Sequence, residues 1–307
     1  MTFKYKQSNN LFNLSKNNEN KNSLGTSRFT SKNKIDTLYE NRFKITTFQK
    51  KTYYLAWDSI ICLPMMDAEY LILKEYENFN YDTIKDVQNL IISGGNVFIS
   101  GGISTLDCLQ FLEFRCCDAF FSPKITAFKN LKKIIFDVDG KAMKYLPDFI
   151  YKTKSLTTLK VSIKNEKSIT NEIRNLPNLE YISLTMQKFN KIPQVLYSLK
   201  NLKRLDILSY QWHKPINLSP EMHKLENLQE ISINIDLNED KNISILAEMK
   251  KLKTLNILKY TSIDIDELKK ISFLNELNIW KISDNELENL KLILPNTKCR
   301  RGFINNY

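Results

Sequence analysis

The chain contains little glycine, cysteine or histidine, with 7, 5 and 2 of these residues among 307. Its glycines form neither of the two common phosphate-binding sequences, G-x-x-x-x-G-K-S/T and G-x-G-x-x-G, and we expect tight turns at the Ser-Gly-Gly segments 93–95 and 100–102. No two cysteines have the C-x-x-C spacing of zinc or redox sites, and neither His213 nor His223 lies in an H-x-x-x-H pair. We therefore expect no metal ion or other cofactor, and reduced, mostly buried thiols.

Long apolar runs are also missing. The apolar stretch at 60–66 has only seven residues, one of them proline, whereas a membrane helix needs roughly 18. Residues 1–10 lack the apolar core of a secretory signal. We therefore expect no membrane association and a cytoplasmic location.

The positive charge of the chain is concentrated near its beginning. Residues 1–51 hold eleven Lys or Arg against three Asp or Glu, and the rest of the chain holds 34 against 31. The same segment has nine asparagines and almost no apolar periodicity, so it buries too little surface to offset the entropy of ordering. We expect a basic, largely disordered tail, for which nucleic-acid binding is an alternative role.

A short phrase recurs from residue 128 onward. It consists of an apolar residue, any residue, Asn or Lys, an anchor leucine, two mostly polar residues and two apolar residues separated by one. The anchor leucines are Leu131, Leu156, Leu179, Leu202, Leu228, Leu252 and Leu274. Their spacings lie inside the range of roughly 20–29 residues that is typical of leucine-rich repeats.

The phrase resembles that of the leucine-rich repeat family, of the cytosolic or bacterial type with irregular repeats. Its closing triplet, such as Leu205-Asp206-Ile207, has the period of two that puts both apolar side chains on one face of a strand. Each unit buries that face only against its neighbours, so the copies must stack. The resemblance implies an α/β repeat solenoid, a leucine-rich repeat horseshoe with a concave parallel β-sheet and an irregular or short-helical convex side.

We expect the chain to divide into a tail and one repeat domain. The expected boundaries are a basic tail at 1–51 and a repeat domain at 52–307, which contains degenerate repeats at about 65–127, clear repeats at about 128–290 and a closing segment at 287–307. In the degenerate part the end of the phrase fits the sequence at 68–73, 87–92 and 106–111.

The segments between the expected strands also resemble the family. Those at 146–150, 192–196 and 218–222 contain a proline that starts an outer turn or short helix in leucine-rich repeats. The column in which the family places asparagine, after the strand, has none in this chain. Apolar residues continue the strand alternation there instead, so we expect longer strands in those repeats; these residues are Val138, Ile163, Met186 and Ile235.

Residues that alternate with the buried strand positions are expected to face the concave side. Between residues 204 and 280 they include an exposed series of Leu208, Leu258 and Trp280, with further aromatic residues just beyond the strands. Aromatic and arginine side chains contribute most to protein interfaces. The candidate protein-binding residues are Tyr181, Arg204, Asp206, Leu208, Tyr210, Trp212, Glu230, Asn256, Leu258, Tyr260 and Trp280.

The resemblance implies a non-catalytic protein–protein interaction module with an unidentified protein partner and no small-molecule substrate; nucleic acid is not the expected partner. An inhibitor or immunity-type protein that blocks an enzyme is the alternative, although the expected concave face is mixed in charge. Residues 134–140 also resemble the first motif of haloacid-dehalogenase-type phosphatases, with Asp137 as nucleophile and Asp139 as acid/base beside magnesium. The next two residues depart from that motif, and its place in the repeat favours a strand followed by a turn.

Overall fold

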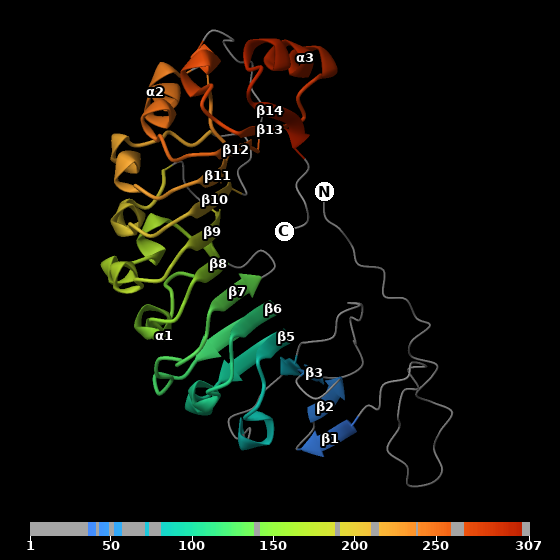
Figure 1. The fold of residues 1–307 in the computed structure, drawn as a ribbon. Coiled ribbons are helices and arrows are strands. Elements are labelled where there is room, and N and C mark those ends of the chain that lie inside the picture. The colour runs from blue at the N-terminus through green and yellow to red at the C-terminus, as the bar shows by residue number, and fades with distance from the viewer. Residues whose placement is uncertain are drawn as a thin grey trace.

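A computed structural model describes most of the chain from residue 36 onward. The described residues are 36–40, 43–48, 52–56, 71–73, 81–137, 142–187, 191–209, 215–237, 239–258 and 267–302. They form an open, curved solenoid in which ten parallel strands follow one another in sequence order (Figure 1). These strands are β5 (Asn89–Ile99), β6 (Phe111–Phe121), β7 (Lys133–Asp137), β8 (Thr158–Ile163), β9 (Tyr181–Met186), β10 (Arg204–Ser209), β11 (Glu230–Ile233), β12 (Thr254–Ile257), β13 (Glu276–Trp280) and β14 (Lys298–Gly302).

Short helices form the convex side of the solenoid, as α1 and α2 show in Figure 1. The helices are α1 (Asp148–Lys152), α2 (Asp240–Glu248), α3 (Asp284–Ile293) and the 3-10 helices η3 (Tyr81–Ile84), η4 (Gly101–Thr105), η5 (Glu166–Ser168), η6 (Asn171–Asn175), η7 (Gln194–Ser198), η8 (Pro220–Lys224) and η9 (Glu267–Ile271). Pro147 and Pro193 directly precede α1 and η7, and Pro220 is the first residue of η8. The prediction that these prolines start the outer helices is therefore confirmed.

Strand pairing confirms the register of the repeats. Leu205 of β10 pairs with Ile182 of β9 and Ile231 of β11, and all three residues are 0% exposed. The seven anchor leucines are buried as well. The core therefore runs as one continuous apolar cluster between the sheet and the convex helices.

The early repeats follow the same register, with one correction. Leu71 of β4 (Leu71–Leu73) pairs with Leu90 of β5, as the phrases at 68–73 and 87–92 predict. For 106–111 the prediction is wrong by three residues, because Leu112, not Leu109, pairs with Leu90 and occupies the first apolar strand position. Apolar residues recur here at every third position, from Ile103 onward, so the phrase fits two registers and only the pairing between strands selects one.

Three further strands precede the solenoid. They are β1 (Asp36–Glu40), β2 (Phe43–Phe48) and β3 (Thr52–Ala56), which pair antiparallel, and β3 and β4 both lie beside β5. Strands β1 and β2 fall within residues 1–51, for which we expected disorder; residues 1–35 lie outside the described part. The difference arises because β2 pairs with β3, for example Ile45 with Leu55, and this partner lies beyond the segment whose composition suggested a tail.

The two Ser-Gly-Gly segments differ from the expected turns. Residues 93–95 lie inside β5, whereas Gly101 and Gly102 open η4. A Cβ atom on Gly102 would lie 2.6 Å from Cδ2 of the buried Tyr81. Glycine is therefore required at 102 by the close approach of Tyr81 rather than by a phosphate.

A ladder of asparagines joins the repeats before the strands. The side-chain amides of Asn130, Asn178, Asn201 and Asn227 each donate to a backbone carbonyl of the preceding repeat, at 2.7–2.9 Å. These asparagines directly precede the anchor leucines. They lie at the turns that lead into β7, β9, β10 and β11, and they satisfy carbonyl groups of the corresponding turns one repeat earlier.

Burial of a convex-side tyrosine predicts alkaline sensitivity. Burial raises the pKa of Tyr197 to about 12, with a smaller opposing effect from its hydrogen bond to Ser219. In the unfolded chain this phenol ionises near pH ~10, so its contribution to stability is complete below that pH and is lost as the pH rises further. We expect the free energy of unfolding to fall by about 1 kcal/mol more between about pH 10 and 11 in the wild type than in Tyr197→Phe.

Chemical denaturation at these two pH values measures that difference. Tyr145→Phe is the matched control, because Tyr145 is 59% exposed and should leave the alkaline loss unchanged. Equal losses in wild type and Tyr197→Phe would contradict the expectation.

Candidate protein-binding face

The candidate site lies on the concave face of the sheet. Strand pairing aligns Tyr181, Arg204 and Glu230 in one column across β9, β10 and β11, and Asp206 beside Ser183 and Ser232 in the next. These positions alternate with the buried core residues, so their side chains point away from the core. Tyr181, Arg204, Asp206 and Glu230 therefore lie on one face of the sheet.

Asp206 is the centre of a polar network on this face. Its side chain is 0% exposed. The Tyr181 hydroxyl donates to Oδ2 of Asp206 at 2.5 Å, and Arg204 donates from Nε and Nη2 to the two carboxylate oxygens at 3.2 and 3.1 Å. The Arg204 guanidinium also lies over the Tyr181 ring, 4.7 Å from its centroid. The three side chains therefore hold one another in fixed positions.

The network continues toward the C-terminal repeats. Nη1 of Arg204 lies 3.3 Å from Oε1 of Glu230, which accepts a hydrogen bond from the Asn256 amide at 3.1 Å. Asn256 in turn accepts from the Asn278 amide at 2.8 Å. Five of the candidate residues are thus brought together across four strands.

Opposing effects set the charge of this face. Burial lowers the pKa of Arg204, but the hydrogen bonds and charge of Asp206 outweigh burial and raise it above its ordinary value. On β8, burial and then the charge of Lys133 lower the pKa of Lys160. Arg204 is therefore firmly cationic, whereas Lys160 is a cation in an unfavourable environment.

Two predicted exposed leucines are buried. Leu208 and Leu258 are each only 6% exposed, so the expected apolar series on the surface is wrong for both. Alternation along a strand predicts the face but not the depth. Neither leucine belongs to the core cluster behind the sheet, so they are buried without being part of the core.

Other candidates have separate positions. Trp280, at the end of β13, is partly exposed and lies under Nζ of Lys281, 4.7 Å from the ring centroid. Tyr210, Trp212 and Tyr260 lie outside the described residues. The sequence prediction omitted Lys160 from the site, although its place in the concave column of Ser183 and Asp206 indicated it.

The described part of the chain also bears on three other possibilities, namely a metal site, the phosphatase-like aspartates and a membrane-spanning helix. No group of three His, Cys, Asp or Glu that could hold a metal occurs there. Asp137 ends strand β7, which pairs with β6 and β8 in the repeat register, and Asp139 lies outside the described residues. Among the residues that the structure describes, no helix is long and apolar enough to span a membrane.

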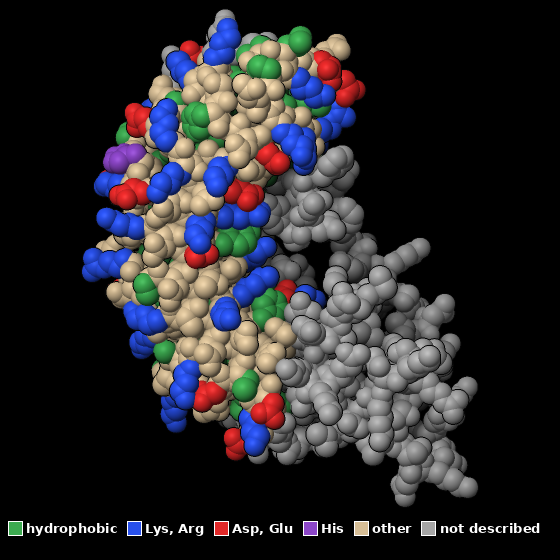
Figure 2. Space-filling view, in the orientation of Figure 1, with side chains coloured by type: hydrophobic (Ala, Val, Ile, Leu, Met, Phe, Trp, Pro, Cys, Tyr) green, Lys and Arg blue, Asp and Glu red, His purple; other side chains and the backbone are tan. Residues whose placement is uncertain are grey.

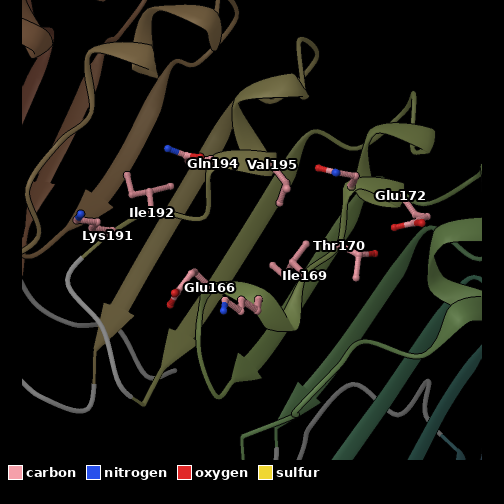
Figure 3. A pocket seen from close by; sticks show the side chains of 10 residues that line it. Glu166, Ile169, Thr170, Glu172, Lys191, Ile192, Gln194 and Val195 are labelled. Carbon is pink, nitrogen blue, oxygen red and sulfur yellow. The ribbon is translucent and has the colours of Figure 1, made fainter.

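A hollow of about 840 Å³ lies away from the concave face (Figure 3). Its lining comes from the η5, η6 and η7 region, where the side chains of Glu166, Glu172, Lys191 and Gln194 are exposed. The hollow is therefore open to water and of mixed charge. Figure 2 shows the same mixture over the length of the solenoid, with Lys and Arg side chains among Asp and Glu.

Comparison with known proteins identifies the fold. No family model matches the sequence. The structure is similar to Toll in the Toll–Spatzle complex of Drosophila, with a TM-score of 0.56 and 12% identity over 85% of this chain and 44% of that chain. It is also similar to TLR13 in its complex with ssRNA13, with a TM-score of 0.50 and 15% identity over 76% of this chain and 36% of that chain.

An internalin (inlF) from Listeria monocytogenes has 16% identity over 72% of this chain and 68% of that chain, with a TM-score of 0.44. The chain spans less than half the length of the Toll and TLR13 chains. The fold is a leucine-rich repeat horseshoe, and its concave parallel sheet and short-helical convex side confirm the predicted fold class.

Proposed function

We propose that this chain is a non-catalytic protein–protein interaction module that binds a protein partner on its concave face. The observation that supports the proposal is the network of Tyr181, Arg204, Asp206, Glu230 and Asn256, which presents aromatic and charged groups in fixed positions. Tyrosine and arginine are frequent energetic centres of interfaces. Groups that are already ordered lose less entropy when a partner binds.

We also propose that the protein acts in the cytoplasm. Cys108 is a free and exposed thiol, and Cys299 is a free and buried one. An exposed free thiol persists most readily in a reducing compartment.

A variant that obstructs the concave face tests the proposed function. Thr254 lies between Glu230 and Glu276 in one concave column, so an arginine there has carboxylates beside it and adds bulk to the surface. We expect Thr254→Arg combined with Trp280→Ala to weaken binding of the partner by about tenfold or more, because a lost interface centre contributes over ~1 kcal/mol.

The experiment uses the full chain in an affinity capture from the source cells, followed by titration of the purified partner. Ser244→Arg on the exposed side of α2 is the matched control and should bind as the wild type does. A partner that is lost by the control as strongly as by the concave variant would contradict the proposal.

A further inference from the structure

We propose that the concave face accepts an acidic side chain, glutamate or aspartate, from the protein partner at Lys133 and Lys160. This inference rests on the proposed function and specifies the chemistry of the partner. The two lysines lie on neighbouring strands, β7 and β8, where Lys133 pairs with Thr158 and Ile135 with Lys160. Both are partly exposed on the concave face.

Neither lysine has an ion pair within the described part of the chain, whereas most other cations of this face do; Arg300, which pairs with Asn278 on the last strand, is an exception. Arg115 is paired with Glu113 at 2.6 Å, Arg204 with Asp206 and Glu230, and Lys298 with Glu276 at 3.9 Å. Most cations of the inner surface thus have a counter-charge, whereas Lys133 and Lys160, on the neighbouring strands β7 and β8, have none.

Aromatic rings hold these ammonium groups in place. Nζ of Lys133 lies 5.1 Å from the centroid of the Phe111 ring, and Nζ of Lys160 lies 5.3 Å from that of Tyr181. Tyr181 is itself fixed by Asp206 on the far side. An arriving carboxylate therefore meets two cations whose side chains are already ordered, which lowers the entropy lost on binding.

The electrostatics of Lys160 favour an anion as the missing group. Burial and then the nearby charge of Lys133 disfavour its protonated form, and they lower its pKa although Asp206 and Glu113 act in the opposite direction. A carboxylate on this part of the face would offset the repulsion between the two lysines and form a charge-assisted hydrogen bond.

The surrounding charges favour a single carboxylate over a nucleic-acid backbone. Glu113, Asp206, Glu230 and Glu276 lie in the same two concave columns, on either side of the lysines. A chain of phosphates laid along the sheet would meet these carboxylates, whereas nucleic-acid sites neutralise many phosphates with a continuous row of cations. An acidic residue on a protein loop needs only the two lysines.

Binding of a fluorescein-labelled peptide of alternating glutamate and glycine to the full chain, followed by anisotropy, tests the inference. We expect Lys133→Gln/Lys160→Gln to weaken binding by about tenfold, since two charge-assisted contacts are lost. The matched control, Lys152→Gln/Lys241→Gln, removes the same charge from exposed positions on α1 and α2 and should change binding less than about twofold. Thermal unfolding verifies that both variants are folded.

Several results would overturn the inference. One is failure of the wild type to bind the peptide, and another is equal weakening of binding by both pairs of substitutions. A glutamine–glycine peptide that binds equally well would also overturn it. So would tighter, lysine-dependent binding of oligouridylate, which would indicate a nucleic-acid site. If the peptide ignores Lys133 and Lys160 while the Thr254→Arg/Trp280→Ala variant still loses its partner, this inference fails and the proposed function stands. If the peptide depends on the lysines while that variant keeps its partner, the proposed function fails instead.

Discussion

Replacement of Leu205 by alanine is expected to lower the free energy of unfolding by about 3 kcal/mol. Leu205 is 0% exposed and lies between Ile182 and Ile231, each from a neighbouring repeat. The substitution removes apolar contacts and leaves a cavity that the two adjoining repeats cannot fill without shifting their own strands. Since each repeat is stabilised only by its neighbours, the loss affects both sides of the array.

Denaturant-induced unfolding of the full chain measures this loss. Leu292→Ala on α3 is the control of identical chemistry, and it should cost less than about 0.5 kcal/mol because Leu292 is 78% exposed. A loss below about 1 kcal/mol for Leu205→Ala would mean that the centre of the array is not packed as described.

The second large effect is expected for Asp206→Asn, with a loss of about 2 kcal/mol in the free energy of unfolding. The side chain keeps its shape, but its amide directs N–H groups toward Arg204 and Tyr181, which are both donors to the carboxylate. Arg204 then loses the nearer of its two counter-charges, and one donor loses its acceptor.

Two variants separate charge from packing in this network. Tyr181→Phe removes one hydrogen bond and should cost about 1 kcal/mol. Glu230→Gln neutralises the more exposed partner of Arg204, and it should cost less than about 1 kcal/mol because water screens this pair. If Asp206→Asn costs no more than Glu230→Gln, then Asp206 is not the centre of the network.

The sequence predicts the architecture well because one local phrase is repeated. The anchor leucines and the alternating triplets mark each strand from 131 to 279, and pairing of Leu205 with its neighbours follows from stacking equal units. The phrase at 106–111 is placed wrongly because apolar residues every third position satisfy it twice. The correct register is decided by pairing with the neighbouring strand β5, and the sequence of this segment alone does not indicate that pairing.

The site is predicted in part for the same reason. Alternation along the strands assigns Tyr181, Arg204 and Asp206 to one face, and in the structure Tyr181 and Arg204 both donate hydrogen bonds to Asp206. The burial of Leu208 is not predicted, because alternation along a strand assigns the face of a residue and not its depth. The hairpin β1–β2 likewise depends on β3, beyond the boundary that charge composition suggested.

The asparagine ladder has a consequence for how such a chain changes length. Each rung joins one repeat to the repeat before it through a backbone carbonyl, which every residue possesses. Duplication or loss of a complete repeat therefore restores the same joint at the new boundary, whatever sequence lies next to it. The spacing between anchors varies from 22 to 26 residues without interrupting the sheet, because the extra residues lie in the connections between strands. The chain can thus change length by whole repeats, and each added or lost repeat lengthens or shortens the inner surface by one strand.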